Sequence, residues 1–306
     1  MSTTEDAHTE EAGTGLVEQV RTLMGEGDYE AALQAGEGGL AEARRRSEGN
    51  PNRLGELVEA LQALGMVRQT LGDYEEAVAL FEEAVSTSAV TEMTPARLAD
   101  INQRLAVLYD FNQREADAVP LYEAAIRLYE TMDPPDPLTA GRLRNNLAMI
   151  YKGLEEFDRA EQHYLKALEA IETALGQESE ELASVCNNLG NLYYKAGFPE
   201  QAREVHEQAL EIRTRVLGER HPDVGQSHSN LGSVLHVLGD KDAARRHFET
   251  SLRLLESFLD EDQDTYEIAA SNYSELLRSE GDERRANAVE KRLHKLLQKH
   301  APEVAV

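Results

Sequence analysis

Residues 74–84 read YEEAVALFEEA, residues 115–125 read EADAVPLYEAA and residues 157–167 read FDRAEQHYLKA. In each stretch, the alanine at the fourth place is followed four residues later by Phe or Tyr and seven residues later by alanine. The leading alanine recurs along the chain at intervals of 41 or 42 residues: Ala77, Ala118, Ala160, Ala202, Ala244 and Ala286. A fixed period of this length predicts a solenoid, in which each repeat buries its apolar side only against its neighbours.

Each repeat is predicted to hold two helices. A second ladder, twelve or thirteen residues before each alanine, pairs a large apolar residue with a small one, as in Leu189-Gly190. An apolar residue such as Tyr193 follows three places later, on the same face of a helix. Turns such as Gly72-Asp73 separate the two helices, because glycine can end one helix and aspartate can cap the next. The sequence therefore predicts an all-α fold without a sheet.

The pattern resembles the tetratricopeptide repeat, whose usual period is 34 residues. The longer period leaves room for a longer second helix, because none of the six positions of the family's helix-ending proline holds proline: Ala89, Glu130, Glu172, Thr214, Glu256 and Gln298. Residues 209–224, ALEIRTRVLGERHPDV, followed by Asn230-Leu231-Gly232, are similar to the 42-residue repeat of kinesin light chains and their bacterial relatives. The resemblance covers roughly residues 50–300 and implies a right-handed superhelical solenoid of antiparallel helix-turn-helix repeats.

We expect seven repeats in one elongated solenoid over residues 15–300, flanked by a disordered acidic tail at 1–14 and a second tail at 301–306. Six regular repeats cover 51–300, and a degenerate capping repeat covers 15–47. The capping repeat carries Gly36, Gly38 and Gly39 in its second helix, and each costs about 1 kcal/mol relative to alanine, so this repeat is predicted to be the least stable. Pro120 lies five residues into a predicted helix, where a shifted start or a kink is expected.

The composition excludes several classes of partner. The chain carries 57 acidic and 31 basic residues, a net charge of −26, which disfavours nucleic acids and anionic membranes. No stretch approaches the roughly 20 apolar residues of a membrane span, and residues 1–15 do not read as a signal or transit peptide. The single cysteine, Cys186, lies on a predicted buried face, which fits a reducing cytoplasm.

The sequence carries no pattern typical of catalysis. The nine histidines include no i,i+4 pair on one helix, and there is no Cys-x-x-Cys, Gly-rich phosphate loop or serine-elbow motif. Tyr109, Tyr151 and Tyr193 fit the repeat core better than acid–base roles. We therefore predict a non-enzymatic protein without metal or cofactor.

In the resembled family, the first helices of successive repeats line the concave face. This implies a set of peptide-binding residues: Arg142, Asn145, Asn146, Met149, Lys152, Asn187, Asn188, Asn191, Tyr194, Lys195, Asn230, His236 and Asn272. Four of these asparagines recur at intervals of 42 residues, and stacked amides can donate to and accept from the backbone of an extended peptide. The alternative is that they bond to neighbouring helices. Arg142, Lys152 and Lys195 occupy predicted groove positions without an acid, which favours an acidic partner.

We therefore predict a cytoplasmic adaptor that binds an extended peptide or partner segment in its concave groove. Two alternatives stay open: a structural or self-assembling scaffold that uses its ends and convex face, and a ligand-sensing regulatory solenoid. The acidic N-terminal end and the basic C-terminal helix favour head-to-tail contact between copies. The last helix also has an apolar side with Leu293 and Leu297, which suits a simple cap, and a monomer is the favoured prediction.

Overall fold

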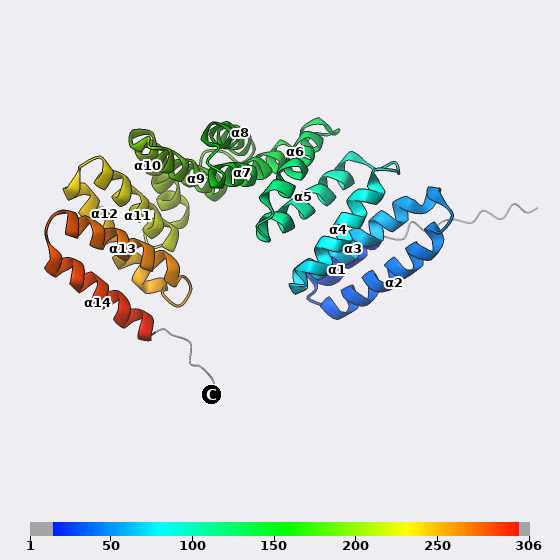
Figure 1. Cartoon of the computed structure of the whole chain (residues 1–306), viewed down its shortest axis with the longest axis horizontal. Coiled ribbons are helices and arrows are strands. Elements are labelled where there is room, and N and C mark those ends of the chain that lie inside the picture. The colour runs from blue at the N-terminus through cyan, green and yellow to red at the C-terminus, as the bar shows by residue number, and fades with distance from the viewer. Residues whose placement is uncertain (1–14, 300–306) are drawn as a thin grey trace, which may run out of the picture. The chain divides into compact units, whose positions relative to one another are not determined.

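The computed structural model describes residues 15–299, and within this range the chain forms fourteen α-helices, two short 3-10 helices and no strand (Figure 1). The predicted all-α fold of consecutive helix pairs is confirmed. The pairs are α1 (Leu16–Gly25) with α2 (Tyr29–Ser47), α3 (Leu54–Leu71) with α4 (Tyr74–Ser88), α5 (Pro95–Phe111) with α6 (Glu115–Thr131), α7 (Pro137–Gly153) with α8 (Phe157–Leu175), α9 (Glu180–Ala196) with α10 (Pro199–Leu217), α11 (Pro222–Val237) with α12 (Lys241–Leu255), and α13 (Gln263–Ser279) with α14 (Glu283–Lys299). The 3-10 helices are η1 (Pro51–Arg53) and η2 (Glu256–Phe258).

The chain divides into two compact units, Met1–Asp136 and Pro137–Val306. The first unit holds α1–α6 and the second holds α7–α14. Within each unit, the second helix of one repeat packs against the first helix of the next, as α4 does on α5 and α10 on α11. Each unit therefore buries its apolar residues through its own stack of repeats. One solenoid running through residues 15–300 stays a prediction, and the two predicted tails lie outside the described residues.

Capping side chains, proline and glycine mark the helix ends. Thr94 caps α5 by accepting a hydrogen bond from the backbone N–H of Arg97 at 3.4 Å, and His221 caps α11 through Nδ1, which accepts from the N–H of Asp223 at 3.2 Å. α8 ends at Leu175 and α10 at Leu217, and the glycine that follows each helix has a positive φ. Proline and glycine therefore set where these helices begin and end.

One position in the turn between the two helices of a repeat takes the left-handed backbone conformation in every repeat. Glycine occupies it in five repeats: Gly27, Gly72, Gly197, Gly239 and Gly281. The other two repeats place Gln113 there with φ 58° and Glu155 with φ 62°. A side chain at positive φ is strained, because Cβ approaches a neighbouring carbonyl oxygen.

The small residue of the first helix faces a large ring on the second. A Cβ added to Gly65 would lie 2.9 Å from the Phe81 ring, and one added to Gly232 would lie 2.9 Å from the Phe248 ring. Phe81 and Phe248 are fully buried. The close approach inferred from the Leu-Gly ladder is therefore the central packing contact of these hairpins.

Pro120 departs from the expected shift. α6 begins at Glu115, three residues before Ala118, and the helices of the other regular repeats begin at the same offset from their alanines. A shifted start is therefore wrong: Pro120 lies inside α6, where it has no N–H to give to the helix. The expected apolar side of α14 is confirmed, since Leu293 is buried against the α13 core and Val289, Leu296 and Leu297 pack beside it.

Candidate functional site

The candidate site is the side of α7, α9, α11 and α13 that carries the predicted peptide-binding residues, here called the asparagine face. These helices are the first helices of the four repeats in the second unit. Side chains on this face reach from one repeat to the next at the repeat spacing; the Lys195 ammonium, for example, donates to the backbone oxygen of Lys152 at 3.3 Å. The structure thus brings residues far apart in sequence onto one surface.

The asparagines cross-link neighbouring repeats. Nδ2 of Asn188 donates to Oδ1 of Asn145 at 3.0 Å, and Nδ2 of Asn230 donates to Oδ1 of Asn187 at 2.7 Å. The alternative of bonding to a neighbouring helix therefore applies to these residues. Asn187 was expected on the exposed groove surface, and this is wrong: it is only 6% exposed and its amide supports Asn230.

The two ends of the row bond differently. Nδ2 of Asn145 donates to Oδ1 of its neighbour Asn146 at 3.3 Å, whereas Nδ2 of Asn272 donates to the Ser233 hydroxyl at 3.2 Å. Within residues 15–299, the amide oxygens of Asn188 and Asn230 accept no hydrogen bond. The amide nitrogen of Asn230 has a second N–H beyond the bond to its neighbour, whereas that of Asn188 also donates weakly to Met149 Sδ. The row is thus oriented by bonds between repeats and keeps part of its hydrogen-bonding capacity.

Two of the three predicted groove cations have acidic partners, and the expectation of unopposed charge is wrong for both. The Arg142 guanidinium binds Glu181 through two bonds of 2.7 and 2.6 Å, and this arginine lowers the pKa of the Glu181 carboxyl. The Lys195 ammonium lies 3.4 Å from Glu155. Glu155 lies in the turn after α7, and Glu181 lies in the first turn of α9. Neither position is among the predicted groove positions.

Lys152 differs from these two cations. Its side chain is half-buried, and among residues 15–299 it has no acidic partner. Burial, together with the charge of Lys195, lowers the pKa of the Lys152 ammonium. The pair Lys152 and Lys195 is therefore a local concentration of positive charge in a strongly acidic chain.

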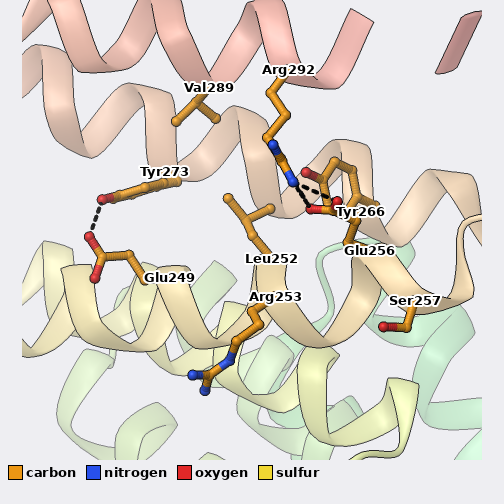
Figure 2. A pocket seen from close by; sticks show the side chains of 9 residues that line it. All are labelled: Glu249, Leu252, Arg253, Glu256, Ser257, Tyr266, Tyr273, Val289 and Arg292. Atoms are coloured by element: carbon orange, nitrogen blue, oxygen red, sulfur yellow. Dashed lines mark hydrogen bonds and ion pairs between the residues drawn. The ribbon is translucent and has the colours of Figure 1, made fainter. Parts of the chain in front are cut away.

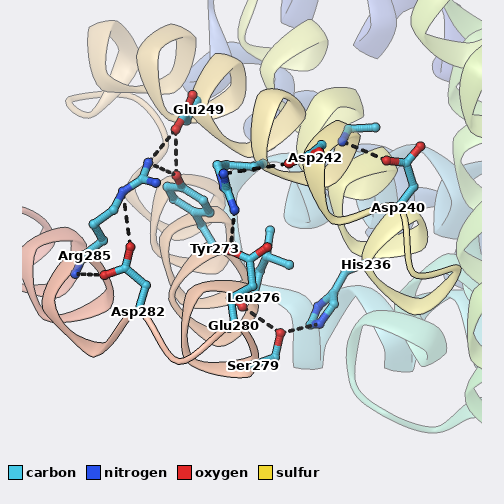
Figure 3. A network of polar contacts seen from close by, with 12 residues as sticks. His236, Asp240, Asp242, Glu249, Tyr273, Leu276, Ser279, Glu280, Asp282 and Arg285 are labelled. Carbon is cyan, nitrogen blue, oxygen red and sulfur yellow. Dashed lines mark hydrogen bonds and ion pairs between the residues drawn. The ribbon is translucent and has the colours of Figure 1, made fainter.

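Apolar contact area is also present on the asparagine face. Met149 is 46% exposed and Tyr194 is 42% exposed. Met149 Sδ lies 3.8 Å from Nδ2 of Asn188. Asn191 is half-buried on α9, and His236 Nε2 lies 3.2 Å from the Ser279 hydroxyl (Figure 3).

A pocket of about 460 Å³ opens beside the first part of the face. Its wall includes Arg142, Asn145, Asn146 and Ser184 from the first helices, and Ile171 and Leu175 from the end of α8. Such a lining offers amide, hydroxyl and apolar groups together, which suits a peptide side chain.

A metal ion and a catalytic reaction each require particular side chains among the described residues. No group of three or more His, Cys, Asp or Glu among them could hold a metal ion. Tyr109 donates to Glu82 at 2.7 Å, and burial followed by that bond raises its pKa to about 12, so it acts as a hydrogen-bond donor between repeats. Burial likewise raises the pKa of the Cys186 thiol to about 11, which makes it a poor nucleophile.

The sequence matches the family model described as tetratricopeptide repeat over residues 138–197, 181–257 and 58–90. Among solved structures, BtubC (BKLC) from P. vanneervenii is 34% identical; the match covers 75% of this chain and 92% of that chain with a TM-score of 0.60. The chain belongs to the tetratricopeptide repeat family. Its 42-residue period places it with the kinesin-light-chain-like members, as predicted.

More distant relatives of this tetratricopeptide repeat protein share the fold alone. TPR-like repeats of a Podosopora anserina protein described as a kinesin light chain are 21% identical over 68% of this chain and 98% of that chain, with a TM-score of 0.56. The apo form of RapI is 13% identical over 79% of this chain and 99% of that chain, with a TM-score of 0.60. No curated protein sequence matches the chain.

Tetratricopeptide repeat proteins are generally non-catalytic modules for protein–protein interaction. Their stacked repeats present long surfaces to which a partner can bind. None of the helices within residues 15–299 is both long and apolar enough to cross a membrane.

Proposed function

We propose that this tetratricopeptide repeat protein is a non-enzymatic adaptor that binds an extended segment of a partner along the asparagine face. The observation that carries the proposal is the row of amides joined from repeat to repeat, with Asn188 and Asn230 keeping their oxygens unbonded. A backbone N–H of an extended segment can donate to each oxygen without any demand on side-chain identity. Because the bonds between repeats already hold the amides, little further ordering is needed on binding.

The partner segment carries acidic residues in this proposal. Lys152 has no acidic partner among the described residues, and Lys195 has only an exposed one in Glu155, a weak kind of pair. A carboxylate of the bound segment would pair with Lys152 and lie close to Lys195. Met149 and Tyr194 would supply apolar contact beside them.

The same proposal places the protein in the cytoplasm as a monomer, with neither nucleic acid nor membrane as a partner. The net charge of −26 opposes polyanions, and the single cysteine is buried and therefore available neither for an exposed disulfide nor for rapid oxidation. The monomer is supported by α14, whose apolar side is already covered by α13.

A site-specific photo-crosslinker in place of Asn191 tests the face directly, since no hydrogen bond of that side chain is disturbed. A crosslinker in place of Asn287, an exposed asparagine on α14, is the matched control. We expect a partner segment to crosslink at 191 and not at 287. The captured segment, made as a peptide, should bind the wild type and lose at least tenfold in affinity with Met149→Glu/Tyr194→Glu.

Lys152→Gln then tests the acidic character of the partner. The peptide should bind this variant more weakly and with a smaller salt dependence than the wild type. Equal crosslinking at 191 and 287, or full affinity in the double variant, would refute the asparagine face. It would favour a scaffold that uses its ends and outer surface.

A further inference from the structure

Three equivalent positions outside the asparagine face hold side chains of opposite charge in two neighbouring repeats. In the repeat formed by α9 and α10, Arg215 lies between two acids: it binds Glu178 at 2.9 Å and Glu211 at 2.6 Å. These bonds show that positions 178, 211 and 215 lie close together in space. The positions 42 residues later hold Arg220, Arg253 and Ser257, so two arginines now flank a hydroxyl where two acids flanked an arginine.

The helix neighbours that could neutralise Arg253 are engaged elsewhere. Glu249, four residues before it, accepts from Tyr273 at 2.8 Å and from Arg285 of α14 at 2.9 Å (Figure 3). Glu256, three residues after it, is bound by Arg292 of α14 at 2.6 Å. Figure 2 shows the Arg253 guanidinium pointing away from these contacts, and within residues 15–299 neither Arg253 nor Arg220 makes an ion pair.

Both arginines line one cavity of about 860 Å³ bounded by α10, α11, α12 and η2. The other polar lining groups are hydroxyls and one histidine, with a single acid among the described lining residues: Thr214, Glu219, His228, Thr250 and Ser257. The apolar wall is Leu210, Val224, Leu254 and Phe258. The volume is in the range of small-molecule sites, and the lining combines an apolar wall on one side with two arginines and several hydroxyls that can bind a charged group.

His228 contributes no positive charge to the cavity at neutral pH. Its Nδ1 lies 2.9 Å from Nδ1 of His247, a bond in which one ring carries a proton on Nδ1 and the other accepts with an unprotonated Nδ1. Burial, His247 and the charge of Arg253 lower the pKa of His228 to about 4. The positive field of the cavity therefore comes from the two arginines, whose planar guanidinium groups suit oxyanions.

We propose that this cavity is a binding site for a small organic oxyanion, a carboxylate or phosphate monoester attached to an apolar body. The charged oxygens lie between Arg220 and Arg253, within reach of the Ser257 and Thr250 hydroxyls, and the apolar body packs on Val224, Leu254 and Phe258. The site is separate from the asparagine face and does not depend on a peptide binding there.

Isothermal titration of the full chain at low salt with three probes tests the site: phenyl phosphate, benzoate and benzyl alcohol. The probes share the ring and differ in charge. We expect the wild type to bind at least one anion tenfold or more tightly than the alcohol; the tighter anion identifies the head group. Arg253→Gln and Arg220→Gln should each weaken that anion at least tenfold, whereas Arg246→Gln, an exposed arginine of α12 outside the lining, should bind like the wild type.

Thermal melting separates a lost site from a lost fold. Arg253 has no ion pair among the described residues to lose, so Arg253→Gln should melt within about 2 °C of the wild type. Two results would overturn the proposal: anions that bind the wild type no better than benzyl alcohol, or an Arg253→Gln variant that binds with unchanged affinity. Neither result bears on the asparagine face.

Discussion

The second helices α10 and α12 belong to neighbouring repeats with the same register, yet their buried residues differ in kind. α12 buries Phe248 and Leu255, as expected for a repeat core. At the same two positions α10 buries His206, which is 1% exposed, and Arg213, which is 4% exposed. The repeat therefore fixes where a large side chain packs, and the chemistry of that side chain can still change from apolar to ionisable.

The polar residues of α10 take their partners from the next repeat. One nitrogen of the Arg213 guanidinium donates to the backbone oxygen of Asp223 at 3.0 Å and to the Ser227 hydroxyl at 3.0 Å, both on α11. In contrast, Nδ1 of His206 and Nε of Arg213 are buried with no hydrogen-bond partner in the described chain. Nε of Arg245 and Oγ of Ser251 on α12 also lack a hydrogen-bond partner in the described chain, so the number of unbonded atoms does not separate the two helices. The difference is that at the two core positions compared here α10 places ionisable side chains, and unbonded buried polar groups there lower stability.

Removing each ring should show this difference most strongly. Phe248→Ala leaves a cavity in an apolar core and should lower the free energy of unfolding by about 3–5 kcal/mol. His206→Ala removes less apolar area and also removes a nitrogen that lacks a partner, so we expect a loss of about 1–2 kcal/mol. Urea denaturation followed by circular dichroism measures both, and equal losses would contradict the contrast between the two helices.

Substitutions of Arg213 test whether its charge or its volume matters. Arg213→Ala loses the bonds to Asp223 and Ser227 and leaves a cavity, so it should destabilise by about 3 kcal/mol. Arg213→Met fills most of the space and removes a buried charge, and should stay within about 1 kcal/mol of the wild type. A methionine variant as unstable as the alanine variant would mean that the guanidinium bonds themselves hold α10 to α11.

Acid should weaken the packing of His206 in α10. Burial and the nearby charge of Arg213 lower the pKa of His206 from 6.5 to about 4. The unfolded chain therefore takes up a proton as the pH falls below 6.5, while the folded chain does so only near pH 4. The contribution of neutral His206 is complete above pH 6.5 and is lost on acidification, with about 2 kcal/mol gone at pH 5.

His206→Phe, which copies Phe248, is the matched variant for this effect. The difference in unfolding free energy between variant and wild type should increase in favour of the variant by about 2 kcal/mol between pH 7 and pH 5. Other groups, His228 and the carboxylates included, titrate in both proteins and largely cancel. A difference that does not change with pH would show that His206 has the same pKa in the folded and the unfolded chain.

The 42-residue spacing predicted most of the fold because it depends on buried positions. Ala160, Leu189 and Gly190 are buried where the helices of stacked hairpins meet. The period alone therefore predicts which face of the helix each of them occupies. The burial of His206 could also be predicted, because this residue lies 42 residues after Tyr164 and 42 before Phe248, at the position of the buried ring. His206 is not among the residues named in the sequence analysis above. That register was the signal that could have found it.

The candidate site was harder to predict, because it depends on which way polar side chains turn. Asn187 and Asn188 are neighbours on one helix, yet the first is buried and supports Asn230 while the second is half-exposed. The pairing of Arg142 with Glu181 joins residues 39 apart, and periodicity does not state whether two such side chains meet. Periodicity predicts which face of a helix a residue lies on. It does not predict whether a polar side chain on that face bonds to another residue of the chain or is left to bind a ligand.

The smallest expected effect compares turns. Gln113 occupies the left-handed position that Gly281 fills in the last repeat, and its exposed side chain makes no hydrogen bond within residues 15–299. A non-glycine residue in this conformation costs about 1–2 kcal/mol of stability, which Gln113→Gly would remove. Because glycine has more freedom in the unfolded chain, part of this stabilisation is offset, and the variant should be more stable by roughly 0.5–1 kcal/mol. Gly281→Ala should have the opposite sign and a cost of about 1 kcal/mol, because a Cβ there meets open space and only the backbone conformation is penalised. Urea midpoints that move in the same direction for both variants would mean that the turn conformation differs between the two repeats.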